Sequence, residues 1–185
     1  AQFQARHYAE GWLIRHCEWE PPAATLLRIP GEAPMKLAGR IDRIDYNERT
    51  DEWLVMDYKT SESGVSPHKT HLGREKLSAV DEMEWEDLQL PLYWYLAQQH
   101  GITGTVKLGY LVLPKRSNGV ELLTADWSAE HLQHGIDKAR EIVRDIRAGK
   151  FELNKDFHKP FDDFARICQT LVFEDDPADG EEADE

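Results

Sequence analysis

The sequence predicts an α/β fold in which a mixed central β-sheet is flanked by helices. Four runs of strand character come first, a helix and a buried strand follow, and a long helix comes last. Strands, helix, strand and helix in this order are typical of an α/β sandwich. A chain of 185 residues, 41% hydrophobic and 31% charged, is long enough and apolar enough to bury one substantial core.

The first half of the chain is predicted to contain a short helix followed by strands. The helix ends near Glu10. Strands are expected near Trp12–Trp19, Thr25–Ile29, Lys36–Tyr46 and Glu52–Lys59. A mobile polar loop is expected over residues 60–79, because Gly64, Pro67 and Gly73 interrupt regular structure there.

The second half is predicted to contain two helices around a buried strand. Apolar residues recur at helical spacing over Trp85–His100, which indicates a helix. Val106–Leu113 then has the composition of a buried strand, and Ser128–Ala148 that of a long helix. Ser128 is the predicted N-cap of the long helix, but His131 replaces the acid of a capping box, so only half of the box is expected.

Two acidic strands joined by a polar loop bring two carboxylates and a lysine together. The loop Asn47–Glu52 is entirely polar and lies between apolar-rich runs, which indicates a hairpin. A turn centred between residues 49 and 50 pairs positions whose numbers sum to 99, so Asp42 should face Asp57. Opposed residues on one face have Cβ atoms about 4.5–5.5 Å apart. Lys59 lies two residues after Asp57 and so points to the same side of the strand.

Two carboxylates this close favour a bound cation. When both are ionised they repel each other unless a cation lies between them. Mg²⁺ typically binds through one or two carboxylates and keeps water and substrate phosphate as its other ligands. Lys59 would stand beside that metal, where it could hold or activate an attacking water molecule. The alternative is a surface hairpin in which Asp42, Asp57 and Lys59 form ordinary salt bridges with neighbouring side chains.

A third motif follows about thirty residues after Lys59, where Gln89 and Tyr93 lie one helical turn apart. Taken alone, this pair could be a polar contact beside a core aromatic residue. Together with GRIDRID around Asp42 and DYKTS around Asp57, it makes the chain resemble the PD-(D/E)XK nuclease superfamily. Within that superfamily the chain resembles the RecB and AddB type nuclease domains of bacterial DNA break processing. The resemblance extends over about residues 11–169.

The resemblance implies a restriction-endonuclease-like core and metal-assisted hydrolysis of phosphodiester bonds. The family's metal ligands correspond to Asp42, Asp57 and the backbone carbonyl of Tyr58. Lys59 corresponds to the catalytic lysine. Gln89 and Tyr93 correspond to the pair beside the active centre and the DNA backbone. The expected cofactor is Mg²⁺, for which Mn²⁺ would substitute.

The chain departs from this family pattern upstream of the first acidic strand. Many members of the branch carry a histidine ligand on a helix well before that strand. His7 and His16 lie nearer to the strands than such a ligand would, and solvated surface positions are expected for both. Glu18 and Glu20 could supply an acidic ligand, although a solvated strand edge is the alternative for both.

A second departure concerns the iron-sulfur cluster that several relatives hold with four cysteines, three of them near the C-terminus. This chain has two cysteines, Cys17 and Cys168, and Lys159 and Asp162 stand where two of the C-terminal cysteines would be. A cluster needs several thiolates, so no cluster is expected. Both cysteines are expected to be small core residues.

The net charge of −13 is unusual for a protein that binds nucleic acid, which usually presents a basic surface. Residues 174–185 contain eight acids and no base, and a disordered tail is expected there. The rest of the chain then carries about −5. Candidate phosphate contacts are His68, Lys69, His71, Arg74, Lys76, Lys115 and Arg116. The alternative for each is a surface charge that serves solubility.

Membrane and secretory classes are not supported by the sequence. No run reaches the roughly 18 apolar residues of a membrane span, and no leader resembles a signal peptide. Two cysteines that do not form the pattern of a disulfide framework are typical of a protein in the reducing cytoplasm, which is the expected location. Because Ala1 lies within a predicted helix, residues 1–173 are expected to be a nuclease domain cut from a longer protein.

The function predicted from these features is a Mg²⁺-dependent DNA nuclease. By resemblance it would be an exonuclease allied with a helicase-like partner in recombination or repair. A catalytically inactive DNA-end-binding or scaffold domain with the same fold is the rival hypothesis. An RNA-directed or tRNA-processing nuclease would use the same residues.

Overall fold

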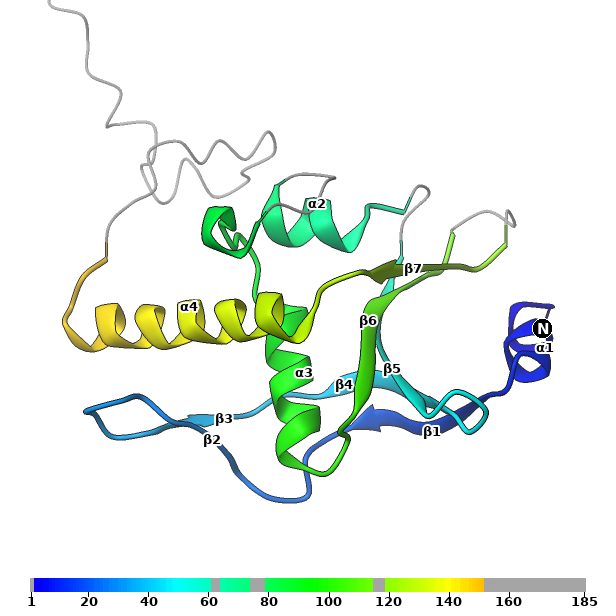
Figure 1. Ribbon diagram of the computed structural model, residues 1–185, viewed down its shortest axis with the longest axis horizontal. Helices are drawn as coiled ribbons and strands as arrows, with labels where there is room; N and C mark the ends of the chain where they lie inside the picture. The colour runs from blue at the N-terminus through cyan, green and yellow to red at the C-terminus, as the bar shows by residue number, and fades with distance from the viewer. Residues whose placement is uncertain (1, 61–63, 74–78, 115–118, 152–185) are drawn as a thin grey trace, which may run out of the picture. The chain divides into compact units, whose positions relative to one another are not determined.

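The computed structural model describes residues 2–60, 64–73, 79–114 and 119–151 (Figure 1). In chain order the elements are α1 (Gln2–Ala9), β1 (Trp12–Trp19), β2 (Thr25–Leu27), β3 (Met35–Leu37), β4 (Ile41–Asn47), β5 (Glu52–Lys59), α2 (Pro67–Leu72), the short 3₁₀ helix η1 (Val80–Glu82), α3 (Gln89–Gln99), β6 (Thr105–Val112), β7 (Glu121–Ala125) and α4 (Ala129–Arg147). The chain divides into two units, residues 1–150 and 151–185, and these elements all belong to the first.

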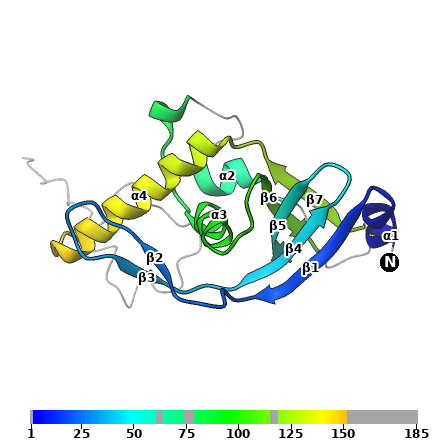
Figure 2. The ribbon, with the colours of Figure 1, turned by 60° about the horizontal axis from the view of Figure 1, so that its bottom comes forward.

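Five strands form a mixed central sheet in the order β1-β4-β5-β6-β7. The β5–β6 pair is parallel, and the other neighbouring pairs are antiparallel. Figure 2 shows α3 lying in the concavity of the curved sheet, with α2 and α4 on the same side. The predicted fold class, a mixed sheet flanked by helices in a restriction-endonuclease-like core, is confirmed.

The two faces of the sheet carry separate apolar clusters. Alternate residues of a strand point to opposite faces. Ile44, Val55 and Leu108 therefore pack together with α3 residues such as Leu90. On the opposite face Leu54, Met56 and Leu111 form a second cluster, against which Phe3 of α1 and Trp12 pack. Helix α3 thus packs on one face of the sheet, and α1 contributes Phe3 to the cluster on the other face.

The hairpin register predicted from the sequence is confirmed. Arg43 pairs with Met56 and Ile44 with Val55, so the position numbers sum to 99 along the ladder. One further step in the same register places Asp42 opposite Asp57. The register is strongly determined because a shift by one residue would move Ile44 and Val55 from the core to the other face.

The predicted continuous strand over Lys36–Tyr46 is wrong, since residues 38–40 separate β3 from β4. Met35–Leu37 pairs with β2 in a separate two-stranded sheet. The chain then passes close to α3, where a Cβ on Gly39 would lie 3.1 Å from the Leu96 side chain. Close packing against a helix replaces strand pairing at this point. The strand expected near Thr25–Ile29 is also shorter in the structure, where β2 ends at Leu27.

The predicted loop over residues 60–79 is also wrong in part, because it contains helix α2. The side chain of Ser66 accepts a hydrogen bond from the Lys69 backbone N–H, and Pro67 occupies the first turn. Gly73 ends the helix in the left-handed conformation, with φ of 62°. The residues that suggested a loop are therefore the capping residues of a short helix.

Three other differences concern the ends of helices and one unpredicted strand. Helix α3 begins at Gln89 and not at Trp85, because the backbone N–H of Glu86 is bonded to the His71 carbonyl of α2. Strand β7 was not predicted. In α4 the Nδ1 atom of His131 accepts from the Ser128 N–H, so histidine completes the capping box that was expected to be half formed.

A buried ion network joins α1 to the sheet and corrects the expectation for His7. His7 is 3% exposed, and its Nε2 lies 2.9 Å from Oδ2 of Asp45. The Arg43 guanidinium donates two hydrogen bonds to the same carboxylate, at 2.8 and 2.6 Å. The imidazole is stacked between the rings of Phe3 and Trp12. His7 is therefore an anchor of α1 and not a solvated side chain.

Two further expectations for this region have different outcomes. His16 is exposed on β1, as expected. Cys17 is also exposed and is not a core residue. β1 is one of the two edge strands of the sheet, and a bulge between Ile14 and His16 interrupts its pairing. Cys168 lies outside the described residues.

The stability of the protein should fall as the pH falls below the ordinary pKa of histidine. Burial lowers the pKa of His7 below 6.5, although the Asp45 carboxylate opposes this effect. The unfolded chain then binds the proton more tightly than the folded chain, so the contribution of neutral His7 is complete above pH 6.5 and is lost below it. Urea unfolding from about pH 8 to about pH 5 measures this slope.

His7→Gln should flatten that slope, whereas His16→Gln, at an exposed position on β1, should leave it unchanged. An equal slope in wild type and His7→Gln would contradict the assignment.

Candidate active site

The two carboxylates and the lysine of the acidic hairpin lie together at one end of the central strands. Asp42 is near the start of β4, and its Oδ2 accepts a hydrogen bond of 2.8 Å from the Tyr58 backbone N–H. Asp57 is 5% exposed near the end of β5. Nζ of Lys59 lies 2.8 Å from Oδ2 of Asp57, which confirms that both side chains point to the same face of the strand.

The electrostatics of Asp57 reflect its confinement. Burial raises the pKa of its carboxyl group, and the negative charges of Asp42 and Asp87 raise it further, whereas Lys59 opposes the shift. An additional cation would relieve both the burial penalty and the repulsion. The protein alone therefore compensates the negative charge of the Asp57 carboxylate only in part.

Helix α3 brings the Q-x-x-x-Y pair to the same place. Oε1 of Gln89 accepts from Nζ of Lys59 at 3.1 Å. Its Nε2 donates to the Tyr93 hydroxyl at 3.3 Å. Burial, with the charge of Asp57 as the next cause, raises the pKa of Tyr93. Asp57, Lys59, Gln89 and Tyr93 therefore form one continuous cluster, although about thirty residues separate the two motifs.

Tyr110 and Asp87 belong to this cluster but were not identified from the sequence. The Tyr110 ring lies under the ammonium of Lys59, 4.9 Å from the ring centroid to Nζ. Oδ1 of Asp87 accepts from the backbone N–H of Gln89 at 2.6 Å. Tyr110 lies inside an apolar strand and resembles any core aromatic residue. Asp87 could have been noticed as an acid just before a helix, where carboxylates often accept backbone hydrogen bonds.

The predicted phosphate contacts are only partly described. Lys69 lies exposed on α2 and His68 is half-buried there. His71 is 0% exposed, so the expectation that it contacts phosphate is wrong. Arg74, Lys76, Lys115 and Arg116 lie outside the described residues. A hollow of about 360 Å³ opens beside the cluster, with Lys59, Val65, Thr70 and Tyr110 among its lining residues. Space for part of a substrate therefore adjoins the Lys59 side chain.

The donor atoms suit a hard divalent cation. Asp42 and Asp57 offer carboxylate oxygens, and a backbone carbonyl such as that of Tyr58 is the kind of third ligand that Mg²⁺ accepts along with water. Within the described part of the chain, no group of three or more histidine, cysteine or acidic side chains is close enough to hold a metal ion. A metal ion at this site would therefore be held by the two carboxylates, and its remaining ligands would come from backbone carbonyl groups and solvent.

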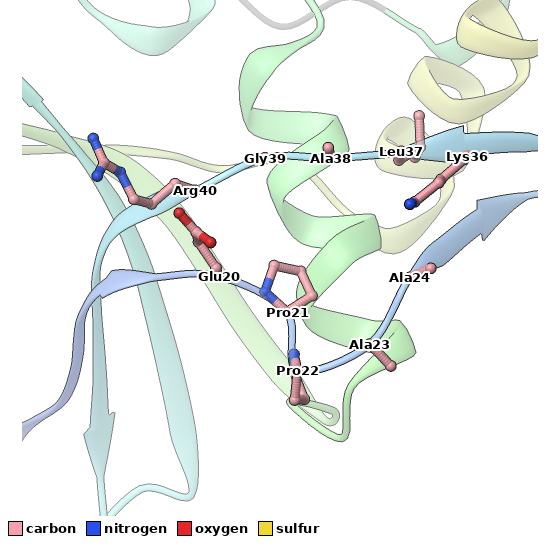
Figure 3. A pocket seen from close by; sticks show the side chains of 10 residues that line it. All are labelled: Glu20, Pro21, Pro22, Ala23, Ala24, Lys36, Leu37, Ala38, Gly39 and Arg40. Atoms are coloured by element: carbon pink, nitrogen blue, oxygen red, sulfur yellow. The ribbon is translucent and has the colours of Figure 1, made fainter.

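The upstream acids are not gathered with these carboxylates. Oε2 of Glu18 lies 2.9 Å from Nε of Arg40 in an exposed ion pair. Glu20 lines a separate hollow of about 630 Å³ (Figure 3). This hollow is formed by residues 20–24, which connect β1 to β2, and by residues 36–40, which include the end of β3 and the connection to β4. Figure 3 shows the Glu20 and Arg40 side chains on the same side of this hollow.

This mixed sheet carries a carboxylate pair and a lysine near the ends of neighbouring strands, and a helix lies across the same face. These features define the restriction-endonuclease-like class of proteins. The family model of the PD-(D/E)XK nuclease superfamily matches residues 2–170. The chain therefore belongs to the PD-(D/E)XK nuclease superfamily, and membership suggests nuclease activity that depends on a divalent metal.

Comparisons with individual proteins add little to the family assignment. None of the curated proteins matches this chain. A solved structure titled "Crystal structure of SSO0001" is similar, with 13% sequence identity and a TM-score of 0.38. The match covers 77% of this chain and 55% of the other, so this chain corresponds to about half of that protein. Among the described residues, no helix is long and apolar enough to span a membrane.

Proposed function

We propose that this protein is a metal-dependent DNA nuclease, and specifically an exonuclease that acts in DNA recombination or repair with a helicase-like partner. The observation that carries the proposal is the placement of the Lys59 ammonium between Asp57 and Gln89, on the face of the sheet that Asp42 shares. The exonuclease activity, the repair role and the partner are inferred from the resemblance to RecB and AddB type domains.

The proposed metal ligands are the carboxylates of Asp42 and Asp57 and the backbone carbonyl of Tyr58, with Mg²⁺ as the preferred ion and Mn²⁺ as a substitute. A divalent cation bound there would polarise a phosphoryl oxygen and lower the pKa of a bound water molecule. The raised pKa of Asp57 is consistent with a site built for a cation, because burial and neighbouring carboxylates leave its charge only partly compensated.

Lys59 is proposed to orient the attacking water and to stabilise negative charge on the phosphate. Three groups limit the positions that its ammonium can take: the Asp57 carboxylate, the Gln89 amide oxygen and the face of the Tyr110 ring. A long lysine side chain loses considerable rotamer freedom when it is held in this way. Because the ammonium is already held before substrate binds, this loss of entropy occurs during folding and does not add to the activation free energy of cleavage.

Gln89 and Tyr93 are proposed to contact the DNA backbone beside the scissile phosphate. Five basic side chains are also proposed to hold the strand: Lys69, Arg74, Lys76, Lys115 and Arg116. Because the chain carries a net charge of −13, binding should depend on these local cations and weaken steeply as salt concentration rises.

The proposal is tested by incubating the protein with end-labelled linear DNA and with closed circular DNA in Mg²⁺, Mn²⁺ or EDTA. Loss of linear DNA in either metal, with the circle spared, is expected for an exonuclease. Cleavage of the circle would instead indicate an endonuclease. Saturable DNA binding without cleavage in any metal would favour the inactive DNA-end-binding domain, and preferential cleavage of competing RNA would favour an RNA-directed enzyme.

A further inference from the structure

Two fully buried polar side chains meet directly behind the proposed catalytic lysine. His71 of α2 is 0% exposed, and Tyr110 of β6 is 1% exposed. The Tyr110 hydroxyl lies 2.6 Å from Nε2 of His71. Burial raises the pKa of Tyr110, so its hydroxyl keeps the proton and can donate it in this hydrogen bond. The proposed mechanism does not use His71.

The other ring nitrogen of His71 faces oxygen atoms of Asp87. Nδ1 lies 2.7 Å from the Asp87 carbonyl oxygen and 3.2 Å from its Oδ1. The hydrogen bond from His71 lowers the pKa of Asp87, so the carboxylate is ionised and, like the carbonyl, can only accept. Nδ1 must therefore donate its proton to Asp87. In the neutral form of the imidazole, Nε2 then accepts from the Tyr110 hydroxyl, so the network determines which ring nitrogen carries the proton in that form.

Both ends of this hydrogen-bonded chain lead to Lys59. At one end the Tyr110 ring supports the Lys59 ammonium at 4.9 Å. At the other end Oδ1 of Asp87 accepts from the Gln89 backbone N–H, and the Gln89 side chain accepts from Nζ of Lys59. His71 is the residue that connects the two ends.

We propose that His71 is a positioning residue that, through Tyr110 and Asp87, holds the Lys59 ammonium in its working place beside Asp57. The inference rests on the proposed function for its effect on cleavage, but the placement of Lys59 can be measured without it. The side chain of His71 touches neither the proposed ligands nor the space beside Lys59. It acts by keeping the tyrosine ring and the start of α3 in fixed positions.

The surroundings of His71 favour a rigid network. The rings of Trp85 and Trp127 pack edge-on against its imidazole, with centroids 6.4 and 5.3 Å away. Hydrogen bonds in such an apolar, water-poor environment are stronger than in water, and a group left without its partner there is costly. The Tyr110 ring therefore has one favoured orientation, and the Lys59 ammonium that lies over it can take only a restricted range of positions.

The matched test uses Tyr110→Phe, which keeps the ring and removes only the hydroxyl, and His71→Asn, whose amide can still donate to Asp87. The control is Tyr95→Phe, which removes an equivalent hydroxyl on α3 that donates to the Leu26 carbonyl at 2.9 Å. Because a displaced catalytic group can cost about 100-fold, we expect kcat to fall about 10- to 100-fold in both test variants, with KM for DNA unchanged. The control should keep the wild-type kcat.

The Tyr110 hydroxyl also bonds the Thr70 side chain, so Tyr110→Phe removes that contact as well as the hydrogen bond to His71. The double variant His71→Asn/Tyr110→Phe should lose no more kcat than the more impaired single variant, because the hydrogen bond between the two residues is already broken in each. Additive losses in the double variant, or an equal loss in Tyr95→Phe, would overturn the proposal. Should His71→Asn not fold, the comparison of Tyr110→Phe with Tyr95→Phe decides the result by itself.

A second readout separates this proposal from the proposed function. In metal-free protein with labelled lysine, the ε-methylene NMR signals of Lys59, assigned by their loss in Lys59→Arg, should carry a ring-current shift from Tyr110. That shift should persist in Tyr95→Phe and move toward the values of an unstructured lysine in both test variants. Unmoved Lys59 signals would overturn the proposal even if kcat falls. If the wild type cleaves no nucleic acid, the proposed function fails and the NMR comparison alone decides.

Discussion

Replacing Lys59 with alanine should reduce metal-dependent DNA cleavage by about 10²- to 10⁴-fold, the range typical for loss of a side chain that positions or moves a proton in the transition state. The variant loses the ammonium that lies 2.8 Å from Asp57 and 3.1 Å from Gln89. Initial rates on end-labelled linear DNA measure the change. DNA affinity, measured by fluorescence anisotropy in EDTA, should change little because one cation among several is removed.

Lys107→Ala is a closely matched control for this experiment. Lys107 also forms a 2.8 Å ion pair with a carboxylate, that of Glu52, and also lies over an aromatic ring, that of Trp12. It lies near the start of β6, away from the strand ends that carry Asp42 and Asp57. Cleavage should remain at the wild-type rate in this variant. Equal cleavage by Lys59→Ala and wild type would show that Lys59 has no catalytic role or that the activity belongs to a contaminant.

Asp45→Ala should lower the free energy of unfolding by about 3–5 kcal/mol, because it leaves a buried charge without its partner. Asp45 is 0% exposed and Arg43 is 5% exposed. The substitution removes both hydrogen bonds that Arg43 donates to this carboxylate, as well as the contact with His7. Urea unfolding at neutral pH measures the loss, which should appear as a lower midpoint with an unchanged slope.

Glu48→Ala is the appropriate comparison for Asp45→Ala, because it removes an ion pair of similar length that is exposed. Oε1 of Glu48 lies 2.6 Å from Arg15, and both side chains are in contact with solvent. Such pairs typically contribute about 0–1 kcal/mol. A loss of less than about 1 kcal/mol in Asp45→Ala would mean that Arg43 finds water or another partner when the carboxylate is removed.

The parts of the fold that were correctly predicted depend on local pattern. The hairpin of β4 and β5 was predicted in its exact register because a short polar loop and alternating apolar residues leave few ways to pair two adjacent strands. The long helix α4 was predicted from its apolar stripe and its Ser128 cap. The helix α2 was missed because it spans only Pro67–Leu72, too short to show a period, and its caps resemble loop residues.

The positions that were wrongly predicted depend on contacts between distant parts of the chain. His7 looked like a surface histidine, yet it is buried because α1 folds back onto Asp45, 38 residues later. The strand over residues 36–46 is divided because Gly39 passes close to Leu96 of α3. No pattern within either segment contains that information.

For the candidate site, the sequence by itself determined which side chains are available and that Asp42, Asp57 and Lys59 share one face of a hairpin. Strand periodicity and a short turn are sufficient for this, because both act between neighbours in the chain. Only the tertiary structure decided that Gln89 reaches Lys59 and that His71, Asp87 and Tyr110 form a hydrogen-bonded network behind it. Those contacts join α2, α3 and β6, and they exist because burial of the apolar face of the sheet brings these elements together.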